Sequence, residues 1–314
     1  MSHIVATGQY LPRQSLSNHD FIKLTGIDST NEWIKQRTGI QQRYFADGEE
    51  TVADMATSAA KHLLAKVDDD VKQKIGLIIV ATMSSKQPTP SVANQVQANL
   101  GISDAWGFDI SGACSGFTMA LETANRFSYS EKSGYTLIIG AEKMSQLLDY
   151  QDRSTVVLFG DGAGAVLLKN DGQPLLDYYS EIKVLKDEHH SLSYQSSDMA
   201  PYFTMNGREV FNFVNRQVIP ALSEFLTSHQ LKPDVIISHQ ANDRLRRIMA
   251  KKMKINEEKL PTNIRSVANT SAASIPLLLN TLVEEGMIKL NQNQKVCFIG
   301  FGGGLAYGIN YFKI

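Results

Sequence analysis

The sequence GLIIVA at residues 76–81 is a short apolar run rich in β-branched side chains, which is typical of a buried β-strand. A matching run, DVIISH, occupies residues 234–239. Leu77 and Val235, which hold equivalent positions in the two runs, are 158 residues apart. Two copies of one strand at such a separation indicate an internal repeat, which should then extend to the neighbouring segments.

Two further pairs of segments recur in the same order and at nearly the same separation. SGACSG (111–116) and NTSAAS (269–274) each open a segment of helical composition, and TLIIG (136–140) and KVCFIG (295–300) each predict a strand. These separations are 159 and 160 residues. An α/β protein without a repeat offers similar strands by chance, and it remains the alternative interpretation.

The repeat predicts an α/β protein with two similarly folded halves, each with helices on both faces of a sheet. We place the halves at residues 1–170, which carry Cys114, and at residues 171–314, which carry His239 and Asn269. Loops at corresponding strand ends of such halves meet near the pseudo-twofold axis. We therefore expect these three side chains to converge.

The composition is that of an ordinary folded protein. Of 314 residues, 43% are hydrophobic and 20% are charged, and the formal net charge is −1. A general nucleic-acid binder is normally far more basic than this chain. Any partner that binds through its charge must therefore bind a local charged patch. The sequence lacks an apolar run of about 18–20 residues and a secretory signal, and two cysteines give no disulfide framework. We expect a cytoplasmic protein that binds neither nucleic acid nor membrane.

Cys114 is flanked by the small residues of segment 112–116, which allow a sharp turn and a close approach of substrate. A cysteine at the start of a helix gains thiolate stabilisation from the helix dipole, and the thiolate is the nucleophile. A small buried cysteine would explain Cys114 taken alone equally well. Cys297, inside a predicted strand, is assigned to core packing.

His239 ends an apolar strand, and polar groups at the carboxyl ends of buried strands face the crevice where open α/β sheets bind ligands. Asn269 lies in a run of small polar residues before a helix, where it could also be an ordinary cap or turn residue. No other histidine of the chain ends a predicted strand in this way.

Cysteine, histidine and asparagine in this chain order fit two chemistries. In a papain-like hydrolase the histidine is the base and the asparagine orients it. In thioester condensation the cysteine holds an acyl group while histidine and asparagine stabilise an enolate. The surroundings of Cys114 differ from the Cys-Gly-Ser-Cys-Trp type of pattern that precedes a papain-like helix.

Seven segments of the chain form one recognisable pattern: residues 32–40, 112–117, 140–142, 159–165, 239–242, 269–274 and 301–304. In this order and spacing they resemble β-ketoacyl-acyl-carrier-protein synthase III, a family with the thiolase fold. The resemblance runs from about Ile4 to Phe312. It implies a duplicated α/β/α/β/α layered fold, which agrees with the repeat.

The resemblance also implies a reaction, the initiation of bacterial type II fatty acid synthesis. An acyl-CoA primer acylates Cys114, and a decarboxylative Claisen condensation with malonyl-acyl-carrier-protein then gives a β-ketoacyl product and CO2. His239 and Asn269 match the pair that assists decarboxylation. The backbone N–H groups of Cys114 and Gly303 match the oxyanion hole. No metal or other cofactor is implied, and the family is homodimeric.

Further residues match positions that bind coenzyme A. Trp33 and Arg37 match residues that bracket the adenine, and Arg153 lies in a matching segment. Phe211 and Asn242 match positions along the pantetheine tunnel.

The sequence departs from the family pattern near these binding positions. Ser154 stands where glycine is usual, Arg208 stands where asparagine is usual, and the stretch between Lys183 and Met205 looks shortened. These departures bear on the nucleotide and pantetheine contacts and leave the predicted chemistry intact.

Residues 242–254 predict an amphipathic helix with a basic face that includes Arg244, Arg247 and Lys251. This face is either a solvated helix surface or a docking patch for an acidic carrier protein.

Several alternatives remain beside the leading hypothesis: a Cys-His-Asn hydrolase, a condensing enzyme of secondary metabolism with a different primer, and a non-catalytic binding module. Two other chemistries of the thiolase fold are disfavoured. A hydroxymethylglutaryl-type synthase needs a glutamate base after the strand at 76–81, but residues 82–86 contain no carboxylate. A degradative thiolase needs a second reactive cysteine near the C-terminus, but Cys297 lies inside a predicted strand. The sequence does not indicate the length or branching of the primer.

Overall fold

The computed structural model describes residues 2–128, 134–194 and 202–314. Its first sheet has five strands, and its edge strands are β1 and β5. In order across the sheet the strands are β1 (His3–Tyr10), β7 (Gly162–Asn170), β6 (Gly134–Glu142), β4 (Ile75–Ala81) and β5 (Trp106–Ile110). Strand β4 is parallel to β5 and β6, whereas β7 is antiparallel to β6 and β1.

The second sheet repeats this arrangement. Its order is β11 (Val235–Ser238), β12 (Lys295–Gly302), β13 (Ala306–Lys313) and β8 (Tyr179–Val184). Strands β11 and β12 are parallel, and β13 is antiparallel to both β12 and β8. These four strands match β4, β6, β7 and β1 in order and direction, so the duplicated layered α/β fold is confirmed. The boundary between residues 170 and 171 stays a prediction.

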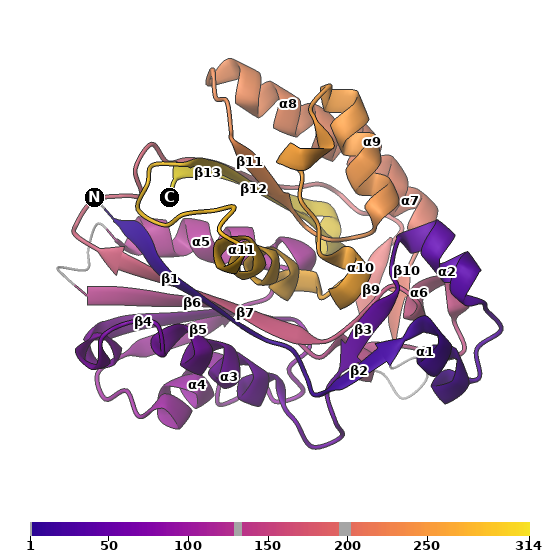
Figure 1. Ribbon diagram of the computed structural model, residues 1–314, viewed down its shortest axis with the longest axis horizontal. Helices are drawn as coiled ribbons and strands as arrows, with labels where there is room; N and C mark the ends of the chain where they lie inside the picture. The colour runs from indigo at the N-terminus through magenta and orange to yellow at the C-terminus, as the bar shows by residue number, and fades with distance from the viewer. Residues whose placement is uncertain (1, 129–133, 195–201) are drawn as a thin grey trace.

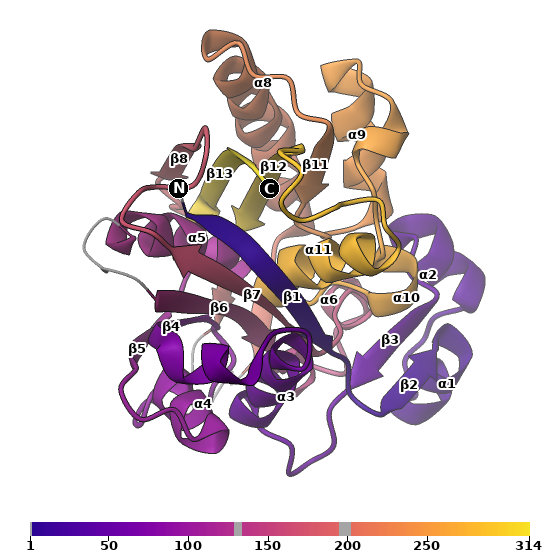
Figure 2. The same cartoon turned by 60° about the vertical axis from the view of Figure 1, so that its left-hand side comes forward.

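Helices form three layers around the two sheets, as Figures 1 and 2 show. Helices α5 (Gly116–Phe127) and α11 (Ser274–Glu284) lie between the sheets. Helices α3 (Val52–Leu64) and α4 (Val92–Leu100) cover the outer face of the first sheet, and α8 (Ile219–Ser228) and α9 (Asp243–Met253) cover the second.

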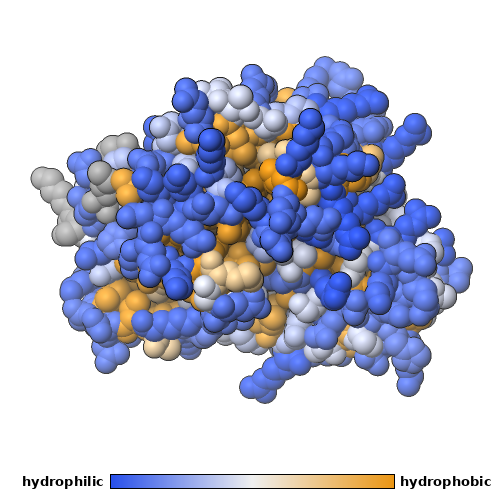
Figure 3. All heavy atoms as spheres, turned by 45° about the horizontal axis from the view of Figure 1, so that its top comes forward, coloured by the Kyte–Doolittle hydropathy of each residue, from blue (hydrophilic) through white to orange (hydrophobic). Residues whose placement is uncertain are grey.

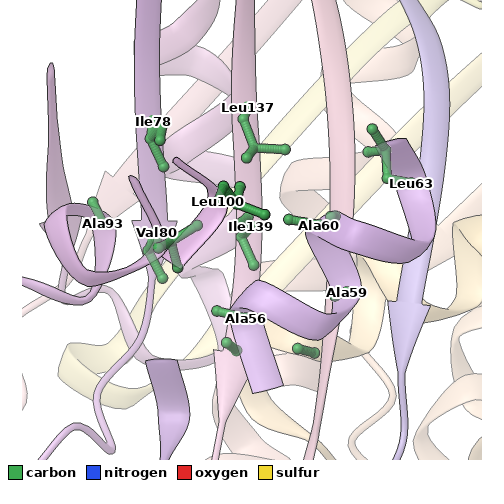
Figure 4. Close-up of a cluster of buried hydrophobic side chains, with 14 of the residues drawn as sticks. Ala56, Ala59, Ala60, Leu63, Ile78, Val80, Ala93, Leu100, Leu137 and Ile139 are labelled. Atoms are coloured by element: carbon green, nitrogen blue, oxygen red, sulfur yellow. The ribbon is translucent and has the colours of Figure 1, made fainter. Parts of the chain in front are cut away.

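Small side chains let the outer helices approach the sheet closely. Ala56, Ala59 and Ala60 of α3 are fully buried against strand residues such as Leu137 and Ile139 (Figure 4). In the central layer, aromatic and aliphatic side chains of α5 and α11 join both sheets into one core. The short turns that precede these helices, Ala113–Ser115 before α5 and Ser271–Ala273 before α11, contact one another.

Shorter elements gather at one end of the sheets, on the right of Figure 1. They are β2 (Gln14–Ser17), α1 (Asn18–Thr25), α2 (Asn31–Thr38), β3 (Gln42–Phe45), α6 (Arg153–Val156), β9 (Leu192–Tyr194), β10 (Phe203–Met205), α7 (Gly207–Phe213) and α10 (Ile264–Val267). They surround the carboxyl ends of the parallel strands, where the candidate site lies.

The helical segment that begins with α7 at Gly207 contains a π-helical turn, Val214–Val218, before α8. Pro220 in the first turn of α8 cannot donate a backbone N–H, which loosens the regular bonding there. Strand β5 was not anticipated, because its sequence WGFDI lacks the apolar β-branched run of its neighbours.

Among the described residues, no helix is both long and apolar enough to cross a membrane.

Candidate active site

The turn that carries Cys114 is tight and strained. After β5, Ala113 adopts a φ of 44°, and residues Ala113–Ser115 form a 3₁₀ turn that leads directly into α5. A positive φ at a non-glycine residue is costly and is characteristic of functional sites. Strand β12 comes so close that a Cβ atom on Gly302 would lie 2.7 Å from Cys114 Cβ. Position 302 therefore requires glycine, because a side chain there would collide with Cys114. We call the turn Ala113–Ser115, which carries the proposed nucleophile, the nucleophile turn.

Cys114 is a buried thiol rather than an exposed thiolate. Its Sγ lies 3.5 Å from the hydroxyl oxygen of Ser271 and donates to it. Burial raises the pKa of Cys114 to about 12, and the nearby Glu142 carboxylate adds to the rise, although the Ser271 hydroxyl opposes it. Burial therefore acts against the thiolate stabilisation that the sequence analysis expected from the start of the helix.

His239 directly follows strand β11, and its backbone N–H donates to the Ile299 carbonyl at 2.7 Å. Its ring lies edge-on to Phe301, with the centroids 5.2 Å apart. Burial lowers the pKa of His239 to about 3, so the imidazole is neutral at physiological pH.

Ser274 holds the ring of His239 in place. The Ser274 hydroxyl lies 2.8 Å from His239 Nδ1, and its oxygen accepts the backbone N–H of Gln240. A hydroxyl oxygen has two lone pairs, so Ser274 can either donate to Nδ1 or accept from it. When Ser274 donates to Nδ1, the ring proton resides on Nε2, and His239 then presents an N–H donor there.

Asn269 has a fixed amide orientation. Its Oδ1 accepts the backbone N–H of Ser271 at 2.9 Å, and an amide oxygen is the end of the side chain that can accept. The Nδ2 group is then the end that can donate to a ligand. Asn269 does not cap α11, which follows a separate 3₁₀ turn, Ser271–Ala273.

The three predicted residues meet in one cavity. Cys114, His239 and Asn269 line one pocket, which opens partly to solvent. Gly303, Phe211 and Asn242 also line it. Met83, Met144, Leu192, Phe203 and Met205 make the remaining wall largely apolar, which suits an acyl chain.

Trp33, Arg37 and Arg153 form a separate cluster on helices α2 and α6. The guanidinium carbon of Arg153 lies 4.8 Å from the Trp33 ring centroid, and that of Arg37 lies 5.6 Å from it. Arg153 also donates to the Asp28 carbonyl at 2.9 Å. An aromatic ring offers a surface on which a flat base can stack, and the neighbouring guanidinium groups can bind phosphates.

A basic groove between α2 and α9 lies outside the cavity. Arg244, Arg247 and Lys251 of α9 line it together with Lys35 and Arg265. In Figure 3 hydrophilic side chains cover most of the face that carries α8 and α9.

The basic residues predicted on this helix face differ in whether their charge is already paired. Arg244 lies over the ring of Phe211, 5.7 Å from its centroid, and so connects the groove to the cavity. Arg247 is paired with Asp243 at 2.8 Å, which reduces its charge toward a partner. Asn242 caps α9 by accepting the Leu245 N–H, so the mouth of the cavity is also the start of the helix.

Three residues at the site were quoted in the motifs but given no role: Glu142, Ser271 and Ser274. Glu142 ends strand β6, much as His239 follows β11, and this repeated position was the available signal. Its carboxylate occupies the space beside residues 82–84, which were noted as lacking a carboxylate of their own. The group comes from the neighbouring strand, which a search along one segment cannot detect.

Solved structures agree with this architecture over the whole chain. The 3-oxoacyl-(acyl-carrier-protein) synthase III from Aquifex aeolicus is 39% identical, with a TM-score of 0.90 over all of both chains. The priming β-ketosynthase of the R1128 polyketide biosynthetic pathway is 32% identical, with a TM-score of 0.90, and the match covers all of this chain and 96% of that one. The fold is that of a thiolase-fold condensing enzyme.

Sequence comparisons identify the family within that class. Models of 3-oxoacyl-(acyl-carrier-protein) synthase III and of its C-terminal part match residues 108–181 and 215–314. The β-ketoacyl-(acyl-carrier-protein) synthase III of Streptococcus sanguinis is 42% identical over 97% of each chain. The chain belongs to the β-ketoacyl-acyl-carrier-protein synthase III family of condensing acyltransferases.

Proposed function

We propose that the protein condenses an acyl-CoA primer with malonyl-acyl-carrier-protein and so starts fatty acid chains. The observation that carries this proposal is the meeting of a thiol nucleophile, a neutral imidazole N–H and an amide NH2 in one largely apolar cavity. Names of relatives at 39–42% identity describe the same activity.

In the first half-reaction Cys114 attacks the acyl thioester and coenzyme A leaves. The backbone N–H groups of Cys114 and Gly303 would hold the oxyanion, since Gly303 lines the cavity beside the nucleophile turn. Each such donor contributes on the order of 10²–10³ in rate.

In the second half-reaction the malonyl group loses CO2 and charge moves onto its thioester oxygen. His239 Nε2–H and Asn269 Nδ2–H donate to that oxygen, and the resulting enolate carbon attacks the acyl group on Cys114. Both donors are neutral, so they do not hold the malonyl carboxylate in place as a cation would. The apolar surroundings favour loss of the charged carboxylate as neutral CO2.

Coenzyme A would be held outside the cavity. Trp33, Arg37 and Arg153 supply a stacking surface and cations for the nucleotide, and Phe211 and Asn242 lie where the pantetheine arm enters. No metal or redox cofactor takes part in this scheme.

The basic groove is the proposed docking surface for the acidic carrier protein. Reversing two exposed charges by Arg244→Glu with Lys251→Glu should raise KM for malonyl-acyl-carrier-protein about tenfold at low salt, and less at high salt. Steady-state kinetics at two ionic strengths measures this effect. The control is Lys61→Glu on the outer helix α3, which should change neither value. An unchanged KM in the double variant would remove the docking proposal.

Two observations bear on the alternative functions. A papain-like hydrolase needs a histidine base, but burial lowers the pKa of His239 to about 3, which makes it a poor proton acceptor. The 32% identity to a polyketide priming β-ketosynthase favours, as second candidate, the same condensation on a different primer in secondary metabolism.

One experiment separates these functions. The protein is incubated with a panel of straight and branched acyl-CoA primers, and intact mass is measured before and after malonyl-acyl-carrier-protein is added. We expect a Cys114 adduct that malonyl-acyl-carrier-protein discharges with formation of a carbon–carbon bond. Release of the free acid without condensation would favour the hydrolase.

We also propose a homodimer formed along β5. This strand is an edge of the first sheet, and Trp106 on it is 47% exposed and packs on Phe108 and Phe127. Unpaired edge strands with apolar side chains readily pair with a second chain. Sedimentation should give twice the 34.7 kDa chain mass, and Trp106→Glu should shift it toward the monomer. Leu24→Glu, at another exposed apolar position, should leave it unchanged.

The proposed location is the cytoplasm. Cys114 and Cys297 are both free thiols in the structure, as a reducing compartment would keep them.

A further inference from the structure

A chain of hydrogen bonds leads from the nucleophile to a buried carboxylate. The Cys114 thiol donates to Ser271 Oγ at 3.5 Å, and the Ser271 hydroxyl donates to Glu142 Oε1 at 3.1 Å. Both donors therefore already point from the sulfur toward the carboxylate. Cys114, Ser271 and Glu142 come from the nucleophile turn, the turn before α11 and the end of β6.

Ser271 is held in this bridging position. Its φ is 48°, in the left-handed region, and its backbone N–H is bound to Asn269 Oδ1. A non-glycine residue keeps such a conformation only where its surroundings enforce it. The residue that bridges Cys114 to Glu142 is thus fixed by the same contact that orients the Asn269 amide.

Glu142 is fully buried and has hydrogen-bond donors but no ion-pair partner among the described residues. It accepts from Thr82 Oγ1, Met83 N and Ser84 Oγ as well as from Ser271. Burying a carboxylate without a cation is costly. Burial raises the pKa of Glu142 to about 7, and the hydrogen bonds oppose that rise, so the group can both take up and release a proton near neutral pH.

The groups that face Glu142 are few. Thr82, Ser84 and Ser271 offer hydroxyls, and Cys114 is the titratable group beyond Ser271. Lys143, next in the chain, directs its ammonium instead to the backbone carbonyls of residues 47, 48 and 50. His239 lines the other side of the Cys114 cavity.

The nucleophile needs a proton acceptor that the three predicted residues do not supply. Cys114 has a pKa raised to about 12 and is therefore protonated at neutral pH. His239 is a weak base, and its Nδ1 is engaged with Ser274. An asparagine amide is not a base. Glu142, reached through one hydroxyl, is the base that the geometry offers.

We propose that Glu142 accepts the Cys114 proton through Ser271 during acylation and stores it until Cys114 is released by condensation. This inference rests on the proposed acyl-enzyme chemistry. In the first half-reaction the S–H bond breaks, the Ser271 proton passes to Glu142, and Ser271 receives the thiol proton. The sulfur bonds to the acyl carbon, and coenzyme A departs as a thiolate that water protonates.

The stored proton serves the second half-reaction. While the malonyl group is bound, Glu142 is uncharged, so it does not repel the enolate that forms in the same cavity. When the enolate carbon bonds to the acyl carbon, Cys114 leaves as a thiolate and recovers its proton from Glu142 through Ser271. The cycle then consumes one proton overall, the one taken up by departing coenzyme A.

The proposal is tested first on the wild-type chain by counting protons during acylation. At pH 7.5 a free alkyl thiol such as coenzyme A is mostly protonated, since its pKa is about 8.5. If Glu142 keeps the Cys114 proton, the solvent loses about two thirds of a proton per acylated cysteine, because about a quarter of Glu142 is already protonated at pH 7.5 and a small part of the released coenzyme A is ionised. An indicator dye in weak buffer records this uptake. If the thiol proton leaves with coenzyme A, the change is near zero, and the proposal is overturned.

Variants then assign the stored proton. Glu142→Gln and Ser271→Ala should each abolish the uptake and slow single-turnover acylation at pH 7.5 by about 10²-fold or more. Thr123→Ala on α5 removes a hydroxyl that bonds to the Met119 carbonyl of the same helix, outside the relay, and should keep the uptake. Thermal unfolding shows whether each variant retains the fold. Uptake that persists in both relay variants would assign the proton elsewhere and overturn the role of Glu142.

The pH profile is a second, independent readout. Wild-type acylation should fall as pH drops through about 7, because a protonated Glu142 cannot accept, and it should level off above that pH. In Glu142→Gln the rate should instead keep rising with pH toward the thiol pKa. Equal profiles for the two proteins would contradict the relay. A wild-type chain that acyl-CoA fails to acylate would overturn the proposed function itself, whereas acylation without uptake overturns only the relay.

Discussion

Cys114→Ala is expected to abolish acylation by acyl-CoA and to lower condensation by about 10⁴-fold or more, the scale at which loss of a nucleophile is felt. The reason is that Cys114 is the thiol at the strained turn in the cavity and the atom from which the proposed relay starts. Intact mass after incubation with acyl-CoA measures the adduct directly. Decarboxylation of the malonyl thioester should survive, because His239 and Asn269 are untouched.

The other cysteine provides the control for this experiment. Cys297 is fully buried in β12, and burial raises its pKa far above the ordinary range. Cys297→Ala should therefore lower the unfolding temperature through loss of packing while the acyl adduct still forms. An adduct that persists in Cys114→Ala, or that is lost only in Cys297→Ala, would contradict the assignment of the nucleophile.

The repeat in the sequence predicted the fold because buried parallel strands are continuous apolar runs. The runs at 76–81 and 234–239 became β4 and β11, and those at 136–140 and 295–300 became β6 and β12. Strand β5 escaped prediction because an edge strand is only half buried and carries Asp109, whose carboxylate accepts the first N–H groups of α4. The sheet edge, and with it the proposed dimer surface, could not be read from hydrophobicity.

The sequence predicted those site residues that belong to recognisable motifs. The prediction was incomplete for the properties that depend on burial. The convergence of Cys114, His239 and Asn269 followed from strand ends. Their protonation states did not, because desolvation is a property of the folded cavity: it keeps the thiol protonated and the imidazole neutral. The role proposed for Glu142 depends on its hydrogen bond with Ser271, which lies 129 residues away in the chain. The segment around Glu142 could not indicate that contact.

The pair proposed to assist decarboxylation is expected to give the second set of large effects. His239→Ala and Asn269→Ala should each leave acylation of Cys114 intact and lower malonyl decarboxylation by about 10²–10³-fold, since each removes one hydrogen-bond donor to the developing enolate oxygen. Release of CO2 from malonyl-acyl-carrier-protein measures this step apart from acylation. Normal condensation by His239→Ala would exclude its assigned role.

Charge and donor geometry can be separated by conservative variants. Asn269→Asp keeps the shape but places a carboxylate beside the enolate, so it should lose more activity than Asn269→Ala. Ser274→Ala removes the hydroxyl that holds His239 Nδ1, and decarboxylation should fall because the ring is then free to rotate or change tautomer.

The pH dependence distinguishes a neutral donor from a titrating acid. Burial holds the pKa of His239 near 3, so the imidazole stays uncharged from pH 5 to pH 8 and keeps the same Nε2–H throughout. Decarboxylation by an enzyme already acylated on Cys114 should therefore show no inflection from His239 in that range. An activity that rises as pH falls through about 6.5, the ordinary histidine pKa, would mean that an imidazolium does this work. The cavity as built opposes that charge, because Phe301 packs edge-on against the ring and no carboxylate pairs with it among the described residues.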